Sequence, residues 1–420
     1  MCLTIPAKIL KTSGTTAEIE KDNTKITINI SAIPEAKKDD WILYISDFAI
    51  KIISTKDAKE ILTLLESRPK ISNQNLSKKF TKIIEKIRLN HKITKSEIIY
   101  LLNTKGDELE TLFAEADVAR KAHLKDFICI HGIIEFSNYC SNDCHYCGIR
   151  CQNKELQRFR LKPVEIIEGA KLAYKKGYKI LVLQSGEDHY YATEMLIDIV
   201  KKIKSESKLF LILSIGERDL KTYKDLKKAG ANGVLFRFET SNPKLFKNMH
   251  PHGKTLEKRL AHLKFFKKLG YYIATGSIVG LPNQTIDDLA DDIIETRRWA
   301  NMITLGPFIP AKNTPLASFE KGSVELTLKM IAIYRLLNSG TRIPVTTAIE
   351  TLDKNGRKKA LSCGANSLMF NITPDKYRKL YQIYDNKYFS EEKMWEKYGL
   401  FDLEGSYRML EEKMAKELNK

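Results

Sequence analysis

The sequence predicts an α/β protein, in which an eight-stranded parallel β/α barrel of the TIM type follows a small all-β domain. From residue 126 onward, short apolar runs alternate with segments of helical period. Before residue 55 the chain instead shows short alternating segments broken by Gly, Asn, Asp and Pro. Parallel strands need helical crossovers, so the later alternation favours a parallel sheet that is buried on both faces. A chain of 420 residues also exceeds what one compact core usually occupies.

The first predicted domain covers residues 1–67. Its expected strand segments are AKILKTS, TAEIEKD, TKITINIS and DWILYISDFAIKIIS, which is the pattern of a small antiparallel barrel. Ser54 or Thr55 is expected to cap a helix that closes the domain. The polar run at 68–79 is typical of a linker.

The second predicted domain covers residues 80–386. Helices are expected first, at 80–93, 95–103 and 107–123. The eight strand candidates are FICIHGIIEF, KILVLQS, LFLILSI, GVLFRFE, YYIATGSIVG, NMITLGPF, IPVTTA and NSLMF. The helices between them are expected at 163–176, 192–206, 218–229, 255–269, 284–300 and 325–338. A doubly wound open sheet is the topological alternative. Residues 387–420 are expected to form a helical tail.

Charge and cysteine usage limit the class of protein. The formal net charge is +18, from 70 Lys and Arg against 52 Asp and Glu. Because the basic residues are spread over all helices and form no block, we expect solvated helix faces and no nucleic-acid partner. Seven cysteines, an odd number with four crowded together, do not resemble a disulfide framework. The sequence shows neither a signal peptide nor an apolar run of membrane-spanning length, so we expect a cytoplasmic protein with no membrane partner.

Four of the seven cysteines lie in the stretch EFSNYCSNDCHYCGIRC. Cys140, Cys144 and Cys147 have the spacing C-x3-C-x2-C and follow the first barrel strand. Thiolates are soft ligands that select zinc or iron–sulfur clusters. With Cys151 as a fourth ligand the site would be closed, as in structural zinc sites. With three thiolates a four-iron cluster keeps one iron open to substrate, and the position after a barrel strand favours this open site.

The C-x3-C-x2-C loop, with the aromatic Tyr146 before its last cysteine, resembles the loop of the radical S-adenosylmethionine (SAM) enzymes. From about residue 80 to 386 the chain resembles the HydE family of FeFe-hydrogenase maturases. The segments that carry this resemblance are GIIEFSNYCSNDCHYCGIR, VLQSGEDHYY, LSIGER, RFETSNPKLFKNMHP, GSIVGLPNQTIDDLADDI, LGPFIPAKNTPLA, LTLKMIAIYRLL, PVTTAIET and CGANSLMFNITPDKYRKLYQIY.

The first 67 residues resemble a second family. MCLTIPAKIL together with DDWILYISDFAIKIISTKDAKEILTLLES resembles HypC, a family of small OB-like chaperones of NiFe-hydrogenase maturation. We therefore interpret the chain as a HypC-type module fused to a HydE-type radical SAM barrel.

The resemblance implies one 4Fe–4S cluster, held by Cys140, Cys144 and Cys147, and SAM as the second cofactor. In the family the open iron binds the amino and carboxylate groups of SAM. An electron from the cluster then cleaves the sulfonium and yields a 5′-deoxyadenosyl radical. The protein orients these cofactors and excludes water and stray reductants.

The resemblance also implies which residues contact SAM: Tyr146, Ser185, Gly186, Glu187, Glu217, Arg237 and Ile278. Ser185, Gly186 and Glu187 would hold the methionine ammonium. Glu217 and Arg237 would face the ribose and the methionine carboxylate, while Tyr146 and the backbone at Ile278 would meet the adenine. Each residue alone is typical of an ordinary strand end, and only their occurrence in order on successive strand ends favours a site. The family often has His where Phe238 stands, which departs from the pattern near SAM.

A second, deeper cavity is also implied by the resemblance. Its expected lining is Thr346, Thr347, Met369, Tyr381 and Tyr384, for which ordinary packing is the alternative. The HydE family is thought to act on an iron–cysteine–carbonyl–cyanide synthon. We therefore expect a small organometallic or amino-acid-derived substrate, a reducing electron donor, and other hydrogenase maturation proteins as partners.

Cys2 is expected to be an iron-carrying thiolate, because the HypC family uses this cysteine to hold an iron with cyanide and carbonyl ligands. An accidental exposed thiol is the alternative. We hypothesise that Cys2 exchanges organometallic iron at the mouth of the barrel. Within the superfamily, a methylornithine-synthase-like or biotin-synthase-like enzyme is the alternative function. Outside enzymes, the alternative is a non-catalytic iron carrier or scaffold.

Overall fold

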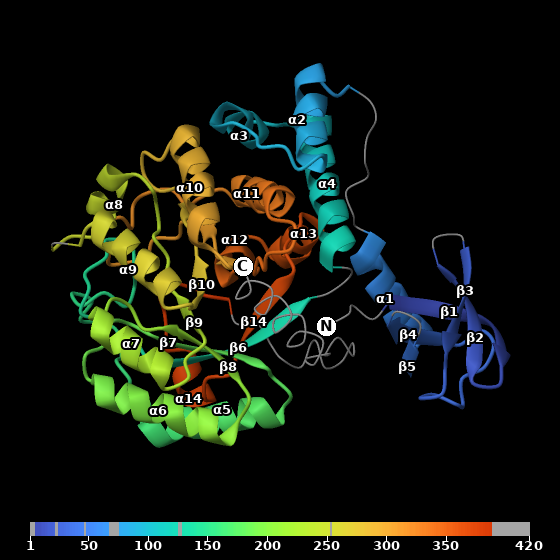
Figure 1. The fold of residues 1–420 in the computed structure, drawn as a ribbon, viewed down its shortest axis with the longest axis horizontal. Helices are drawn as coiled ribbons and strands as arrows, with labels where there is room; N and C mark the ends of the chain where they lie inside the picture. The colour runs from blue at the N-terminus through green and yellow to red at the C-terminus, as the bar shows by residue number, and fades with distance from the viewer. Residues whose placement is uncertain are drawn as a thin grey trace.

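The computed structural model describes residues 5–21, 24–45, 48–66, 75–124, 128–252 and 254–388. Two groups of elements follow one another along the chain, a small β-barrel with one helix and a larger α/β unit (Figure 1). Cys2 and nearly all of the expected tail, from residue 389 onward, lie outside the described residues.

The N-terminal unit is a closed five-stranded barrel with the strand order β1-β2-β3-β5-β4. Its strands are β1 (Ile5–Ser13), β2 (Thr16–Lys21), β3 (Thr24–Asn29), β4 (Trp41–Ile45) and β5 (Phe48–Ile53). All neighbouring strands are antiparallel except β3 and β5, which pair in parallel. The single segment expected at the end of the barrel is two strands, β4 and β5. Inward-facing Ile9, Ile19, Ile28 and Ile42 fill the core.

Helix α1 (Thr55–Glu66) follows β5 directly. The backbone N–H of Asp57 donates to the hydroxyl of Ser54 at 3.0 Å, so Ser54 is the residue that caps the helix. Ser54 is one of the two residues predicted to cap this helix, and the other, Thr55, is its first residue.

Three helices precede the large barrel: α2 (Lys78–Arg88), α3 (Lys95–Leu102) and α4 (Gly106–Leu124). Ser77 accepts a hydrogen bond from the N–H of Phe80, so α2 begins two residues inside the expected linker. It also ends at Arg88, five residues earlier than expected. Asn90 has a φ of 55°, a left-handed conformation that a helix cannot continue through. Helices α3 and α4 both pack against α11, and α3 also packs against α10, so these helices join the outer layer of the barrel.

The large unit is built on a parallel sheet of seven strands in the order β12-β10-β9-β8-β7-β6-β14. The strands are β6 (Cys129–Ser137), β7 (Ile180–Ser185), β8 (Phe210–Ser214), β9 (Gly233–Leu235), β10 (Tyr272–Thr275), β12 (Met302–Ile303) and β14 (Ser367–Asn371). Single bridging pairs, Met302 with Arg342 and Pro344 with Ser367, join β12 to β14 through the segment 342–344. This segment is the seventh strand candidate, and it completes the ring in eight positions. The expected barrel is therefore confirmed over the doubly wound sheet.

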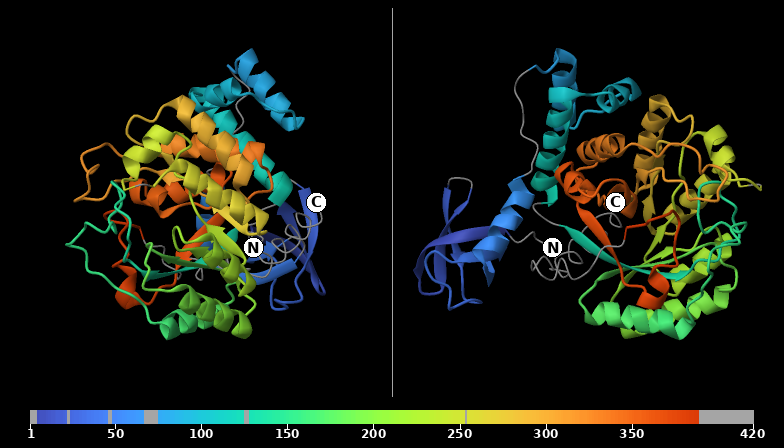
Figure 2. Two further views of the ribbon diagram at one scale, coloured as in Figure 1. Left: turned by 60° about the vertical axis from the view of Figure 1, so that its left-hand side comes forward. Right: turned by 180° about the vertical axis from the view of Figure 1, so that it is seen from behind.

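Helices lie outside the strands (Figure 2). The six expected crossover helices are α5 (Pro163–Lys175), α6 (Thr193–Glu206), α7 (Leu220–Lys228), α9 (Leu256–Lys268), α10 (Ile286–Trp299) and α11 (Val324–Leu337). Four short helices were not expected: α8 (Pro243–Met249), α12 (Thr347–Leu352), α13 (Gly356–Ser362) and α14 (Asp375–Arg378). A two-stranded sheet, β11 (Ile278–Val279) with β13 (Gly306–Pro307), extends the barrel at its carboxyl end. Short helices carry little periodicity, which is why the sequence did not reveal them.

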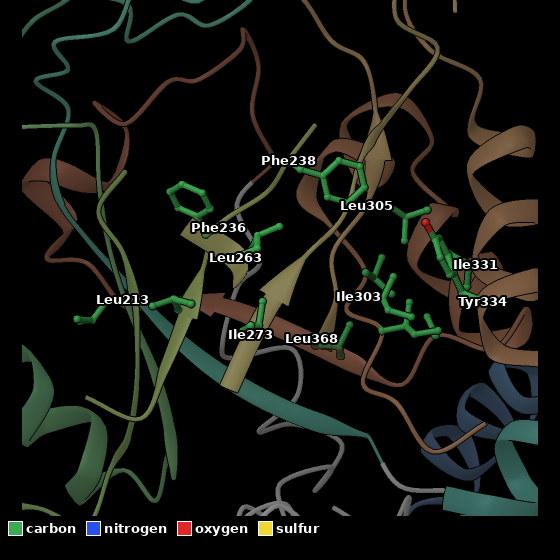
Figure 3. Close-up of a cluster of buried hydrophobic side chains, with 14 of the residues drawn as sticks. Leu213, Phe236, Phe238, Leu263, Ile273, Ile303, Leu305, Ile331, Tyr334 and Leu368 are labelled. Atoms are coloured by element: carbon green, nitrogen blue, oxygen red, sulfur yellow. The ribbon is translucent and has the colours of Figure 1, made fainter. Parts of the chain in front are cut away.

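The core of the large unit lies between the strands and the helices. Leu305, Ile331 and Tyr334 gather where α11 meets the sheet (Figure 3). All three side chains are fully buried. None of the helices in the described part of the chain combines the length and apolar character needed to cross a lipid bilayer.

Candidate active site

A cavity of about 370 Å³ opens at the carboxyl ends of the barrel strands and continues into the barrel. It is lined by most of the residues that the sequence singled out: Cys140, Tyr146, Cys147, Ser185, Gly186, Glu187, Arg237, Ile278, Thr346, Thr347, Met369, Tyr381 and Tyr384. Cys144 and Glu217 do not reach its wall. Residues more than 240 positions apart are thus brought to one space, because parallel strands carry their carboxyl ends to the same edge.

The cysteine loop is fastened to the end of β7. The N–H of Ser141 donates to the carbonyl of Glu187 at 2.9 Å, and the N–H of Glu187 donates to the Cys140 sulfur at 3.3 Å. Gly186 makes this approach possible, since a Cβ there would lie 2.1 Å from the carbonyl oxygen of Tyr139. Glycine is therefore required by close backbone contact and not by its φ angle.

One arginine shapes the far side of the cysteine loop. The guanidinium of Arg158 donates to four backbone carbonyls, those of Asn138, Ile149, Arg150 and Asn153. These groups belong to a loop without regular secondary structure, where carbonyls lack strand or helix partners. Arg158 satisfies them and holds the loop in one shape.

Three thiols converge within this loop. Burial raises the pKa of Cys147 to about 12 and that of Cys144 well above its usual value, and the neighbouring thiols raise both further. Burial also raises the pKa of Cys140. Metal ligation requires the thiolate form, so a bound cationic cluster would have to offset both the desolvation and the mutual repulsion of these three groups.

Cys151 interacts electrostatically with Cys140 but lies outside the cavity wall. Its N–H donates to the carbonyl of Asn142 at 2.8 Å, at the opposite end of the loop from Cys147. Among the described residues, no three His, Cys, Asp or Glu side chains have the arrangement of a single-ion site.

Glu187 lies in a charged network beside the cysteine loop. Its carboxylate accepts hydrogen bonds from Lys254 at 2.8 Å, from the N–H of Glu217 at 2.7 Å and from Asn142 at 3.0 Å. Burial raises the pKa of Glu187, but Lys254 and the other donors outweigh it and keep the pKa below its ordinary value. Glu187 is therefore an anion that already has protein partners.

Arg237 and Glu239 form a second charged pair at the end of β9. The Arg237 Nη2 atom lies 2.9 Å from Glu239 Oε2 and also donates to the carbonyl of Ser277 at 2.9 Å. Glu239 has a φ of 69°, a conformation that non-glycine residues adopt at a cost. The strained backbone directs a carboxylate into the cavity wall, which is typical of a functional position.

The upper wall of the cavity has an apolar side. Tyr146 packs with Ile278, Met249, Leu281 and Phe308, and its ring centre lies 6.3 Å from that of Phe308. A flat apolar ligand group would meet this surface. Phe238, in contrast, is fully buried in the barrel core and does not line the cavity.

The deep part of the cavity mixes hydroxyls and aromatic rings. The hydroxyls of Thr347 and Tyr384 lie 2.6 Å apart, and Gln184 donates to the hydroxyl of Tyr381 at 3.2 Å. The hydroxyls of Thr346 and Thr304 are buried and have no hydrogen-bond partner among the described residues. Buried hydroxyls rarely stay unpaired, so these two favour a polar ligand in the cavity.

A buried ion pair forms another part of this wall. Lys387 and Glu135 pair directly, with side chains 6% and 3% exposed, and Asn371 donates to the second oxygen of Glu135 at 2.6 Å. Sequence reasoning missed both charges, as it missed Arg158, Glu239 and Lys254. Only Glu239 had a nearby signal, since it follows two residues after Arg237 at the end of the same strand candidate.

Sequence comparisons agree with this geometry. The sequence model of the radical SAM superfamily matches residues 134–294, which include the cysteine loop and the ends of β7 to β10. The model of the HupF/HypC family matches residues 1–65. The FeFe-hydrogenase maturase subunit HydE of Thermotoga maritima is 47% identical over 279 residues, which are 66% of this chain and 80% of that protein.

The chain belongs to the HydE family. It is a radical SAM enzyme fused to an N-terminal HypC-type domain. A second relative, the 3-methylornithine synthase of Methanosarcina acetivorans, is 30% identical over 312 residues, covering 73% of this chain and 85% of the relative.

Solved structures share the fold of this HydE family member. The methylornithine synthase PylB aligns with a TM-score of 0.68 at 24% identity, over 78% of this chain and 99% of that one. The FeFe-hydrogenase maturase HydG from Carboxydothermus hydrogenoformans aligns with a TM-score of 0.67 at 22% identity, over 82% of each chain. At these identities the similarity concerns the barrel architecture.

The cofactors are those of the superfamily, a 4Fe–4S cluster and SAM. The residues present fit both groups. Cys140 and Cys147 lie in the cavity wall with Cys144 in the same loop, and the wall offers charged pairs, unpaired hydroxyls and an apolar surface. A ligand with an amino-acid end and an aromatic base would meet each of these features.

Proposed function

We propose that this protein reductively cleaves SAM to a 5′-deoxyadenosyl radical and acts in maturation of the hydrogenase active site, at the diiron subcluster of the H-cluster. The observation that supports this most is the convergence of three partly buried cysteines in one loop, with Cys140 and Cys147 in the wall of a cavity that continues into the barrel. A cluster there would have its open iron next to a cavity in the size range of small-molecule and cofactor sites.

We assign Cys140, Cys144 and Cys147 as the cluster ligands. Among the SAM contacts, Ser185, Gly186 and Glu187 would bind the amino group of the methionine moiety, while Glu217 and Arg237 would act toward its carboxylate and the ribose. Tyr146 and Ile278 would pack on the adenine, a role supported by their apolar surroundings. Arg158 and Gly186 would keep the loop in the shape that the cluster needs.

The deep cavity would hold the second substrate. Thr346, Thr347, Met369, Tyr381 and Tyr384 surround it. The unpaired hydroxyl of Thr346 and the paired hydroxyls of Thr347 and Tyr384 suit a small polar substrate, which we propose to be an iron–cysteine–carbonyl–cyanide synthon or a related amino-acid-derived molecule. The enclosed position would exclude water from the radical.

The HypC-type domain would connect this reaction to other hydrogenase maturation proteins. Cys2 lies outside the described residues, and we propose from its sequence context that its thiolate carries iron to or from the barrel. Such a protein needs a reducing electron donor for its cluster. The described cysteines are all free thiols, which supports a reducing, cytoplasmic location.

Anaerobic cluster reconstitution tests the proposed reaction. The reduced, loaded protein should convert SAM into 5′-deoxyadenosine and methionine, and Cys→Ala substitution at any of Cys140, Cys144 or Cys147 should abolish the products. Cys151→Ala is the matched control and should retain a full complement of iron and cleavage activity. Loss of the cluster in Cys151→Ala would contradict the open site, and no SAM cleavage by the wild-type protein would favour an iron carrier.

Similarity to a 3-methylornithine synthase suggests a second candidate function, the synthesis of a methyl-branched amino acid. Product analysis with candidate amino acids separates the two. Formation of a methyl-branched amino acid, with no effect of the protein on hydrogenase maturation, would replace the proposed substrate while leaving the radical chemistry in place.

A further inference from the structure

Lys254 inserts an ammonium group between two carboxylates beside the cysteine loop. Its Nζ atom lies 2.8 Å from Glu187 Oε1 and 2.9 Å from Glu217 Oε2. The two carboxylates follow the neighbouring strands β7 and β8, whereas Lys254 directly precedes Thr255, the residue that caps α9. The contact therefore joins three separate parts of the barrel mouth.

A second cation balances the charge of this network. Arg259 Nε lies 3.2 Å from Glu217 Oε1, an ion pair without the alignment of a hydrogen bond. The charges of the two carboxylates and the two cations therefore balance in the protein without a ligand. The side chain of Glu187 is only 5% exposed, so its carboxylate would be destabilised if it had no cationic partner.

The Lys254 ammonium is chemically the same kind of group as the amino end of a methionine moiety. The inference that follows rests on the proposed function, in which Glu187 receives that end of SAM. We propose that Lys254 is an internal competitor for this position. An incoming amino group must displace Lys254 from Glu187 or share the carboxylate with it. In either case the affinity for SAM falls, because the two positive groups compete for one carboxylate.

Lys254 is suited to leave and return. Its side chain is 21% exposed, against 5% for Glu187 and 13% for Glu217, and its four-carbon stem is flexible. When SAM is cleaved, the methionine product still carries the competing amino group. Return of Lys254 to Glu187 and Glu217 would then promote release of methionine.

The competition is tested by ligand binding to the cluster-loaded protein in its oxidised state, in which SAM is not cleaved. The probes are SAM, L-methionine and 5′-methylthioadenosine, which lacks the amino-acid end. Lys254→Met should bind SAM and methionine at least about fivefold more tightly than wild type, while 5′-methylthioadenosine affinity stays unchanged. Lys254→Arg, which keeps a cation, should stay near wild type. Lys258→Met, an exposed position on the helix that follows Lys254, is the matched control.

Unchanged or weaker SAM binding by Lys254→Met would overturn the inference, as would an equal change for 5′-methylthioadenosine. Lys254→Gln gives a second neutral variant that keeps a hydrogen-bond donor, and retained 5′-methylthioadenosine binding reports that each variant is folded. If wild type cleaves SAM and the variants bind it alike, only the competitor role is wrong. If wild type neither binds nor cleaves SAM, the proposed function fails and the inference fails with it.

Discussion

Gly186 is the residue at which strand β7 and the cysteine loop come closest. A Cβ at this position would lie 2.1 Å from the Tyr139 carbonyl oxygen and 2.8 Å from the Cys140 Cβ, so Gly186→Ala must displace the loop. We expect this variant to lose roughly 1 to 3 kcal/mol of stability and to bind less iron after reconstitution. Thermal unfolding and iron analysis measure both effects. Gly340→Ala, where a Cβ would meet open space, should match wild type.

Cys129 is a fully buried thiol at the start of β6, outside the cysteine loop. Its sulfur lies 3.1 Å from Arg342 Nε and 3.1 Å from His131 Nε2. Burial alone raises the pKa of Cys129, but Arg342 and His131 outweigh burial and lower the pKa from 9.0 to about 6. The thiolate is therefore stabilised by the fold. Its contribution to stability is complete above pH 9 and is lost as the pH falls through 6.

Cys129→Ala should remove this contribution. Because it deletes the anion that Arg342 pairs with, we expect a loss on the order of 3 kcal/mol at pH 9 and a much smaller loss at pH 6. Denaturant unfolding across this pH range measures the difference. Cys363→Ala is the control, since the pKa of that buried thiol is raised and it stays neutral. A pH-independent loss in Cys129→Ala would show that packing, and not charge, is what Cys129 supplies.

At the scale of elements, one ion pair connects the first barrel strand to the last described segment. Glu135 lies on β6 and Lys387 lies beyond α14, and both side chains line the cavity. Glu135→Gln would leave a buried ammonium beside a neutral amide, and we expect a loss of about 3 to 5 kcal/mol. The double variant Glu135→Gln with Lys387→Met should recover a large part of it, because no unbalanced charge remains. If the stability losses of the two single variants simply add in the double variant, the Glu135–Lys387 pair does not stabilise the attachment of the last described segment.

At the scale of the whole molecule, the two units have separate cores. The N-terminal core, which includes Ile9 and Ile42, shares no residue with the core of the large barrel. A variant that begins at residue 75 should therefore keep its fold and cleave SAM within about twofold of the full chain. The same deletion should lower hydrogenase maturation if the HypC-type domain handles iron. Full loss of SAM cleavage would show that the barrel needs the domain.

Sequence alone determined the architecture to a large degree. Alternating apolar runs and helical periods predicted the strand and helix order of the barrel, and the C-x3-C-x2-C spacing located the cluster loop. These features are local, since each depends on neighbouring residues along the chain. The errors were local too. The predicted range of α2 began and ended too late, and the run from Trp41 to Ile53 contained two strands and not one. The short helices gave no periodic signal.

Only the tertiary structure decided which charged side chains lie at the site and which of them pair. Lys254 lies 67 residues from Glu187, and Lys387 lies 252 residues from Glu135, so no local pattern marks either pair. A lysine in a chain with 70 basic residues reads as a solvated side chain until the fold buries it. Burial and distance give these groups their energies, and both quantities arise only when the strands close into a barrel.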